Sequence, residues 1–271
     1  MAESVTTLAA LRRRIASLEG VPVVKGGGRV ATGHDAIDQA LQGGFARGRV
    51  HELFGGAEEE GAAVGLGLIL AQLAAGDAPL FWLRGASRTA AQAYGPGLVA
   101  LGLDPAKLLI GMMATEALLL QAAADALRCP ALGALVIELR GRAPLLDLTA
   151  SRRLALAAEA SGVTALLLRI DGDPVPSAAE TRWQVAAAPS VPLAGNAPGM
   201  SAFDISLLRR RSGPDGLGWR LIWDSERGAF GDECHERHDH GQDSGGRGAG
   251  APLSGAVVPL PATRPAAHHA A

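Results

Sequence analysis

The residues around position 60 have the spacing of a phosphate-binding loop but lack its chemistry. Gly56 and Gly61 are separated as in the pattern G-x-x-x-x-G-K-[ST], whose lysine and hydroxyl hold the phosphates and Mg²⁺. Here Ala62 and Ala63 occupy the lysine and hydroxyl positions. The lysine would supply charge-assisted hydrogen bonds worth about 1.5 to 3 kcal/mol each, and an alanine supplies none.

Three consecutive carboxylates, Glu58, Glu59 and Glu60, stand where the start of a helix would otherwise meet phosphates. Repulsion between two unit charges at 4 Å is about 1 kcal/mol in water and about 4 kcal/mol at an effective dielectric constant of 20. The same carboxylates interact favourably with a helix dipole. We therefore expect no bound nucleotide or other cofactor, and no catalytic residue, in this loop. From these residues alone, a surface loop that never held a nucleotide is the alternative.

The segments around this loop alternate between short apolar runs and longer Ala- and Leu-rich runs, which is typical of a parallel sheet covered by helices. The expected strands are 50–54, 80–83, 108–112, 132–139 and 163–170. The expected helices are 61–75, 87–101, 115–128 and 148–161, with Thr115 and Thr149 as N-terminal caps. A two-residue alternation then predicts an antiparallel extension with strands at 181–187, 203–210 and 217–224 and a turn at 212–216.

The two ends of the chain lack this alternation. Residues 1–28 are predicted to form an amphipathic helix and a linker, and the apolar stripe of the helix docks either on the chain's own core or on a partner. Residues 226–271 are rich in Gly, His, Pro and Ala, so we expect a disordered tail. The residues of the tail that could ligate a metal are Cys234, His235, His238 and His240. A structural site needs an ordered frame, so no native metal site is expected.

Composition narrows the class of protein. A net charge of −2 and a pI near 6.4 exclude a global positive field that would draw the chain onto nucleic acid. The longest apolar run, 62–70, is shorter than the roughly 20 residues that span a bilayer. The two cysteines lie far apart, which fits a reducing compartment. We expect a cytoplasmic protein that does not contact membranes.

Residues 30–210 resemble RecA in the order and spacing of their motifs. The stretch 32–55 is similar to that family's approach to its phosphate-binding loop, and 101–110 resembles the stretch that enters its third strand. Residues 135–139 resemble the Walker B strand, with Glu138 at or near its acidic position. The family's water-activating glutamate has no counterpart, because 80–103 contains no Asp or Glu. The resemblance implies a RecA-like domain over 29–225 with a degenerate loop and no ATPase activity.

Two further stretches resemble the ImuA family. Residues 181–190 match its Thr-Arg-Trp-x-Val-x-Ala-x-Pro-Ser pattern, and 207–211 with 218–224 resemble its Arg-rich strand followed by a Trp-containing strand. This resemblance implies an accessory protein of the SOS response to DNA damage, which acts in mutagenic translesion synthesis. It would be a scaffold for an ImuB-like Y-family protein and an error-prone replicative-type polymerase, with RecA as a further candidate partner. An ATP-dependent RecA-like DNA-binding protein and a SulA-like cell-division inhibitor stay open as alternatives.

Basic residues near strand ends are the candidates for contact with DNA or a partner protein. The RecA loops that hold single-stranded DNA correspond here to 140–148 and 171–180, which are short, so we expect at most weak DNA contact. Arginines beside an aromatic residue suit phosphates and bases, and they are equally typical of protein interfaces. The candidates are Arg140, Arg142, Arg169, Arg182, Trp183, Arg209, Arg210 and Arg211.

Overall fold

The computed structural model describes residues 27–86, 93–197, 199–211, 213 and 215–231. The strands are β1 (Arg29–Val30), β2 (Phe45–Ala46), β3 (Val50–Gly55), β4 (Leu80–Gly85), β5 (Leu108–Met113), β6 (Ala134–Arg140), β7 (Thr164–Ile170), β8 (Thr181–Ala187), β9 (Ala202–Arg210), β10 (Gly218–Asp224) and β11 (Ala229–Gly231). The α-helices are α2 (Asp35–Ala40), α3 (Glu60–Ala75), α4 (Gly95–Ala100), α5 (Glu116–Ala126) and α6 (Leu148–Ser161), and the 3₁₀ helices are η1 (Ala57–Glu59), η2 (Pro105–Lys107) and η3 (Ala194–Asn196).

One large mixed sheet organises these elements. Its strand order is β11-β10-β9-β8-β3-β7-β6-β4-β5, and a separate small sheet pairs β1 with β2. The strands from β8 to β5 in this order run parallel, whereas β9, β10 and β11 continue the sheet antiparallel. This arrangement confirms the predicted α/β fold with a mostly parallel sheet and an antiparallel C-terminal extension. In it, β7 separates the loop-bearing strand β3 from the Glu138 strand β6.

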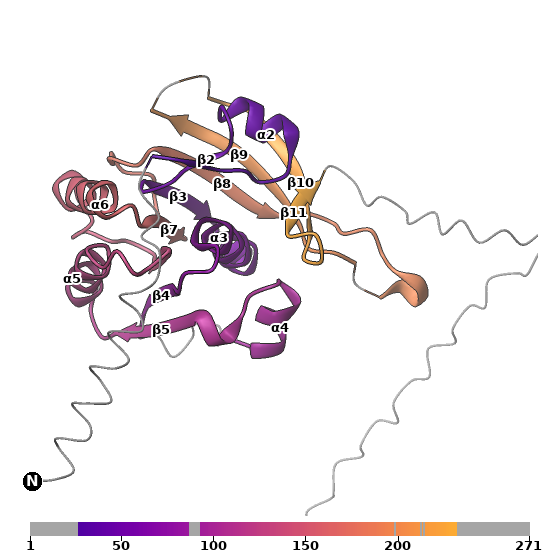
Figure 1. Cartoon of the computed structure of the whole chain (residues 1–271), viewed down its shortest axis with the longest axis horizontal. Coiled ribbons are helices and arrows are strands. Elements are labelled where there is room, and N and C mark those ends of the chain that lie inside the picture. Colours follow the sequence, from indigo (N-terminus) through magenta and orange to yellow (C-terminus); the bar gives the residue numbers. More distant parts are fainter. Residues whose placement is uncertain (1–26, 87–92, 198, 212, 214, 232–271) are drawn as a thin grey trace, which may run out of the picture. The chain divides into compact units, whose positions relative to one another are not determined.

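Helices bury both faces of the parallel part. Helix α3 covers one face and helices α5 and α6 cover the other, while α2 lies beside the antiparallel strands, as Figure 1 shows. Helix α3 is apolar almost all round, which suits a helix that is enclosed by the sheet and its neighbours. A Cβ at Gly67 would lie 2.6 Å from Leu168 Cδ2, so this glycine lets α3 approach the sheet closely.

Of the two predicted helix caps, one is confirmed and one is wrong. Thr115 Oγ1 accepts the backbone N–H of Leu118 at 3.3 Å and begins α5. Helix α6 begins two residues earlier than a Thr149 cap requires, because Asp147 has extended backbone angles and its Oδ1 accepts the N–H of Ala150 at 2.7 Å. Thr149 therefore lies inside the first turn of α6, and the stronger acceptor before it is the cap.

The helix predicted at 87–101 is shorter in the structure. Helix α4 covers only Gly95–Ala100, residues 93–94 are not helical, and 87–92 lie outside the described residues. Pro96 in the first turn explains the start of the helix, since proline fits there but breaks a helix interior.

The ordered sheet extends past the predicted domain end at 225. Strand β11 pairs with β10, and Phe230 is buried in the core. The N–H of Phe230 also donates to the Thr32 carbonyl at 2.9 Å. The first residues of the predicted tail therefore complete the domain. The predicted N-terminal helix and the Cys234, His235, His238 and His240 cluster lie outside the described residues.

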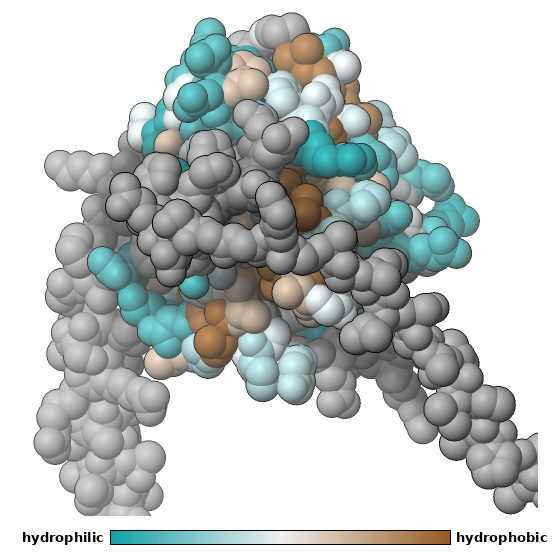
Figure 2. Space-filling model, turned by 90° about the vertical axis from the view of Figure 1, so that its right-hand side faces the viewer, coloured by the Kyte–Doolittle hydropathy of each residue, from teal (hydrophilic) through white to brown (hydrophobic). Residues whose placement is uncertain are grey.

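Hydrophilic residues occupy much of the top and right of the face in Figure 2, with small groups of hydrophobic residues between them. Scattered exposed apolar side chains of this kind are normal on proteins. Within the part of the chain that the structure describes, no helix has both the length and the apolar character needed to cross a membrane.

Candidate functional site

The loop that joins β3 to α3 is closed up as a short 3₁₀ turn, in which the N–H of Glu59 donates to the Gly56 carbonyl at 3.0 Å. No residue from 55 to 63 has a positive φ, so this backbone lacks the alternating conformation that makes an anion-binding nest. An added Cβ would meet nothing within 4 Å at Gly56 or Gly61, whereas at Gly55 it would lie 2.8 Å from the Ala63 Cβ. The glycine that the structure requires is Gly55, and the predicted G-x-x-x-x-G spacing does not form a phosphate cradle.

Two of the three loop glutamates bind other parts of the chain. Glu59 Oε2 accepts the backbone N–H of Ala187 at 2.6 Å, which ties the loop to the end of β8. Glu60 forms a two-pronged ion pair with Arg140, in which Nη1 donates to Oε2 and Nη2 to Oε1. Glu58 is exposed. Glu59 and Glu60, which were expected from the sequence to repel phosphates, therefore hold the loop in place.

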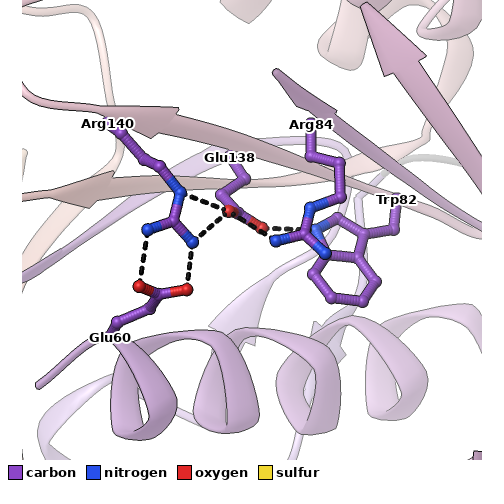
Figure 3. A network of polar contacts seen from close by, with 5 residues as sticks. All are labelled: Glu60, Trp82, Arg84, Glu138 and Arg140. Carbon is purple, nitrogen blue, oxygen red and sulfur yellow. Dashed lines mark hydrogen bonds and ion pairs between the residues drawn. The ribbon is translucent and has the colours of Figure 1, made fainter. Parts of the chain in front are cut away.

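Arg140 joins this loop to the Walker B-like residue Glu138. Its Nε and Nη2 donate to Glu138 Oε1 at 3.0 and 2.8 Å (Figure 3). The buried Glu138 carboxylate also accepts Arg84 Nη2 at 3.1 Å on Oε1 and Trp82 Nε1 at 3.0 Å on Oε2. The Arg84 guanidinium lies 4.5 Å from the centre of the Trp82 ring. Both oxygens of Glu138 are thus occupied by donors of the chain itself.

We call these five residues, Glu60, Trp82, Arg84, Glu138 and Arg140, the edge network. It contains two carboxylates and two guanidiniums, so its formal charges cancel. Hydrogen bonding to Glu60, followed by the charge of Glu138, raises the pKa of Arg140 above its usual value. The network gives each buried charge an opposite partner, which is what makes buried charges tolerable.

The described residues do not fit a bound Mg²⁺-nucleotide. Ala62 and Ala63 offer no phosphate or metal contact, Glu60 is paired with Arg140, and both oxygens of Glu138 accept hydrogen bonds. Among the residues that the structure describes, no group of three or more His, Cys, Asp or Glu side chains could hold a metal ion. The charged groups of the edge network are therefore paired with one another.

Two predicted contact residues, Arg169 and Arg182, lie inside the protein. Arg182 Nε pairs with the fully buried carboxylate of Glu52 at 2.7 Å, and its Nη2 donates to the Val175 carbonyl at 2.7 Å. The guanidinium carbons of Arg169 and Arg182 lie 5.8 and 5.1 Å from the centre of the Phe54 ring. Burial lowers the pKa of Arg169. These contacts of both guanidiniums are therefore with other parts of the chain.

Trp183 was predicted as a candidate for contact with DNA or a partner protein, and its side chain is only 1% exposed and lies in the core. Its Nε1–H donates to Thr181 Oγ1 at 2.7 Å, and Thr181 Oγ1 lies 2.7 Å from His51 Nδ1. His51 Nε2 lies 2.9 Å from the Ala46 carbonyl. Burial lowers the pKa of His51 to about 4, so the neutral ring donates from Nε2 and accepts at Nδ1.

This arrangement explains the Thr-Arg-Trp stretch. Because strand side chains alternate between faces, Thr181 and Trp183 point to His51 while Arg182 points to Glu52. Sequence analysis missed His51 and Glu52. The available signal was a histidine and a glutamate inside an otherwise apolar strand, since such residues are buried only with partners.

The remaining basic candidates do not form one patch. Arg142 is exposed just after β6, at the carboxyl ends of the parallel strands. Arg209, Arg210 and Arg211 lie at the opposite edge, because the end of β9 pairs with the start of β8. Arg210 donates to the Ala40 carbonyl and Arg209 to the Ser177 carbonyl at 3.4 Å, while both Arg209 and Arg211 are exposed.

Comparison with known proteins supplies the family. No protein-family model matches the chain. Two curated relatives, from Caulobacter vibrioides strains NA1000 / CB15N and ATCC 19089 / CIP 103742 / CB 15, are both called Protein ImuA. Each is 33% identical over 206 residues, which cover 70% of this chain and 81% of the relative. This similarity spans most of both proteins, and it shows that the chain belongs to the ImuA family.

Proposed function

We propose that this chain is a non-catalytic accessory protein of DNA-damage-induced mutagenic translesion synthesis. It acts in the cytoplasm as a scaffold for an ImuB-like Y-family protein and an error-prone replicative-type polymerase. Membership of the ImuA family supports the translesion context. The observation that carries the non-catalytic part is Arg140, which pairs with both Glu60 of the loop and Glu138 of the Walker B-like strand.

The edge network supports this proposal because its charged groups are already paired with one another. A nucleotide site must leave such groups free for the phosphates and Mg²⁺. A nucleotide site needs a cation facing the loop and a carboxylate free to approach Mg²⁺. Here a carboxylate faces the loop, and the acidic side chain of β6 is held by Arg84, Arg140 and Trp82. A triphosphate would have to break these pairs and sit beside Glu58 and Glu59. A role in binding other proteins requires none of these changes.

A nucleotide titration tests the non-catalytic part. Calorimetry with Mg²⁺-ATP and an assay of phosphate release should show neither saturable binding nor turnover for the wild-type chain. The combined variant Glu60→Ala, Ala62→Lys, Ala63→Thr restores the missing side chains and removes one carboxylate. We expect no turnover from it either, because Glu138 stays paired. Micromolar, Mg²⁺-dependent ATP binding by the wild type, with turnover that Glu138→Gln abolishes, would favour the ATP-dependent alternative.

A reconstitution tests the scaffold. The purified chain should form one complex that contains both the ImuB-like protein and the polymerase, detected by size-exclusion chromatography. A variant that ends at Gly231 keeps β11 and shows whether residues 232–271 are required. A complex of the two partners that forms equally well without the chain would contradict the scaffold role.

A further inference from the structure

The outer side of α6 carries an exposed leucine between two grooves. Leu156 is 66% exposed near the middle of the helix, whereas Leu154 and Ala158 of the same helix are buried against the sheet. An isolated exposed leucine is ordinary, but one placed between two hollows offers an apolar ridge to a partner.

The first groove lies between α6 and the end of α5. It has a volume of about 650 Å³ and is lined by Arg128, Pro130, Arg153, Leu156, Ala157, Ala160 and Ser161. The second groove lies between α6 and the starts of β3 and β8. Its volume is about 240 Å³, and its lining residues include Leu156, Ala155, Arg49, Arg152 and Arg211. We call Leu156 and the two grooves the α6 face.

The α6 face is basic although the whole chain is slightly acidic. Five arginines and two glutamates line the two grooves. Arg49 pairs with Glu159 at 2.6 Å and Arg128 with Asp125 at 2.8 Å, and the charge of Arg211 also acts on Glu159. Arg152 and Arg153 form no salt bridge with any residue that the structure describes, and these two guanidiniums flank the apolar ridge, one in each groove. Arginines around an apolar centre are typical of the residues that carry binding energy at protein interfaces.

We propose that the α6 face binds an acidic segment of another protein, which places apolar side chains in the grooves beside Leu156. Charge complementarity supports carboxylates in the partner, because the unpaired arginines lie on both sides of the ridge. Nucleic acid fits less well, since the exposed Leu156 between the grooves would face a phosphate backbone, which has no apolar side chain to pack against it. This surface is separate from the edge network, so the proposal is independent of the nucleotide question.

A peptide probe tests this directly. A fluorescein-labelled 14-residue peptide of glutamates and aspartates with two leucines is titrated with the full chain and followed by anisotropy. Two matched peptides carry glutamine in place of the acids or serine in place of the leucines, and a 14-nucleotide oligothymidylate represents nucleic acid. The acidic leucine peptide should bind most tightly. Arg152→Glu with Arg153→Glu, and separately Leu156→Ser, should each weaken its binding by at least about tenfold.

Matched controls come from the same chain. Arg227→Glu and Leu193→Ser change an exposed arginine and an exposed leucine away from α6 and should leave binding unchanged. Circular dichroism melting confirms that every variant is folded. The exposed Cys129, next to Arg128 and Pro130 of the first groove, gives a positional readout. With Cys234→Ser, a benzophenone attached to Cys129 should crosslink to the bound acidic peptide.

Three results would overturn the proposal. The first is absence of binding, or binding that the α6 variants do not weaken. The second is tighter binding of the oligothymidylate than of the acidic peptide, which would make the face a nucleic-acid site. The third is a change of oligomeric state in sedimentation when Leu156 becomes serine, which would make the face an interface between copies of this chain.

Discussion

The edge network and the α6 face contain the same side-chain types and use them in opposite ways. At the edge, Arg84 and Arg140 point at buried carboxylates, and the apolar partner is the Trp82 ring (Figure 3). On the α6 face, Arg152 and Arg153 are exposed beside an exposed leucine. A count of arginines does not separate the two regions. What separates them is whether each guanidinium already has its partner within the chain.

The edge lies where parallel α/β sheets usually bind ligands, at the carboxyl ends of the strands. In this chain, side chains replace both parts of a Mg²⁺-nucleotide. The Glu60 carboxylate at the start of α3 supplies the negative charge that a helix N-terminus favours, and Arg140 supplies the countercharge. The strand-loop-helix layout is therefore stable without a ligand. The charged groups of the edge network are paired with one another, whereas Arg152 and Arg153 of the α6 face are exposed and form no salt bridge with a described residue.

The largest expected effect follows from breaking the buried pair in the edge network. Arg84→Met removes a guanidinium that is 5% exposed from a carboxylate that is 1% exposed. Removing one member of a buried ion pair costs about 3 to 5 kcal/mol of unfolding free energy when the other charge is left unpaired. We expect about 3 kcal/mol, the lower end of this range, because Arg140 and Trp82 still donate to Glu138. Urea unfolding followed by far-UV circular dichroism measures this loss. The exposed Arg142 on the same edge is the matched control, and Arg142→Met should change stability by less than about 0.5 kcal/mol.

If the two variants were equally stable, the edge network would not hold the fold, and the comparison between the two regions would fail. The double variant Arg84→Met, Glu138→Leu gives a second test of the buried pair. It removes both charges of the pair, so it should be more stable than Arg84→Met alone.

The next effect concerns His51, an inward-pointing polar group on the loop-bearing strand. Its folded-state pKa of about 4 is below the ordinary 6.5, so between these values the unfolded chain binds a proton that the folded chain does not. Its contribution to stability is therefore complete above pH 6.5 and declines as the pH falls towards 4, by up to about 3 kcal/mol. Urea unfolding from pH 7 to 4.5 measures this decline. His51→Gln, whose side chain does not titrate, should show a shallower one, and an identical pH profile would contradict a neutral buried His51.

A smaller effect is expected where the edge network meets solvent. Arg140→Met removes the ion pair with Glu60, whose two side chains are 27% and 20% exposed, and one of the two guanidiniums that pair with Glu138. We expect a loss of about 1 to 2 kcal/mol, because water partly screens the pair with Glu60 and because Arg84 and Trp82 still donate to Glu138. Hydrogen exchange of the backbone amides at 57–63 should become faster while exchange in β6 stays slow. Unchanged exchange at 57–63 would show that Glu59 and the 3₁₀ turn hold the loop without Arg140.

Periodicity predicted the sheet and its helices well because parallel strands and their covering helices are locally encoded. The strands β6 and β7 are largely apolar on both faces, and Thr115 is a local cap. The sequence patterns failed where a partner that is distant in sequence determines whether an element forms. Strand β11 exists because Phe230 packs into the core, and nothing in its Gly-rich surroundings indicates this.

The site was predicted in part for the same reason. Missing side chains are visible in a sequence, so Ala62 and Ala63 show directly that the lysine and hydroxyl of a phosphate-binding loop are absent at these positions. Partners that are distant in sequence are not visible. Arg140 and Glu60 are 80 residues apart, and Arg182 and Glu52 are 130 apart, so arginines that looked free for DNA proved to be paired within the fold.

The smallest effect on stability is expected on the α6 face, and this near-absence of an effect completes the comparison. Arg152→Glu with Arg153→Glu changes two exposed side chains that pair with no described residue, and Leu156 is already in contact with solvent. Each α6 variant should therefore lie within about 0.5 kcal/mol of the wild type in urea unfolding. A loss above about 2 kcal/mol would show that these side chains belong to the fold, as those of the edge network do. Since the Arg152 and Arg153 guanidiniums form no salt bridge with a described residue, stability without these charges is the result that distinguishes the α6 face from the edge network.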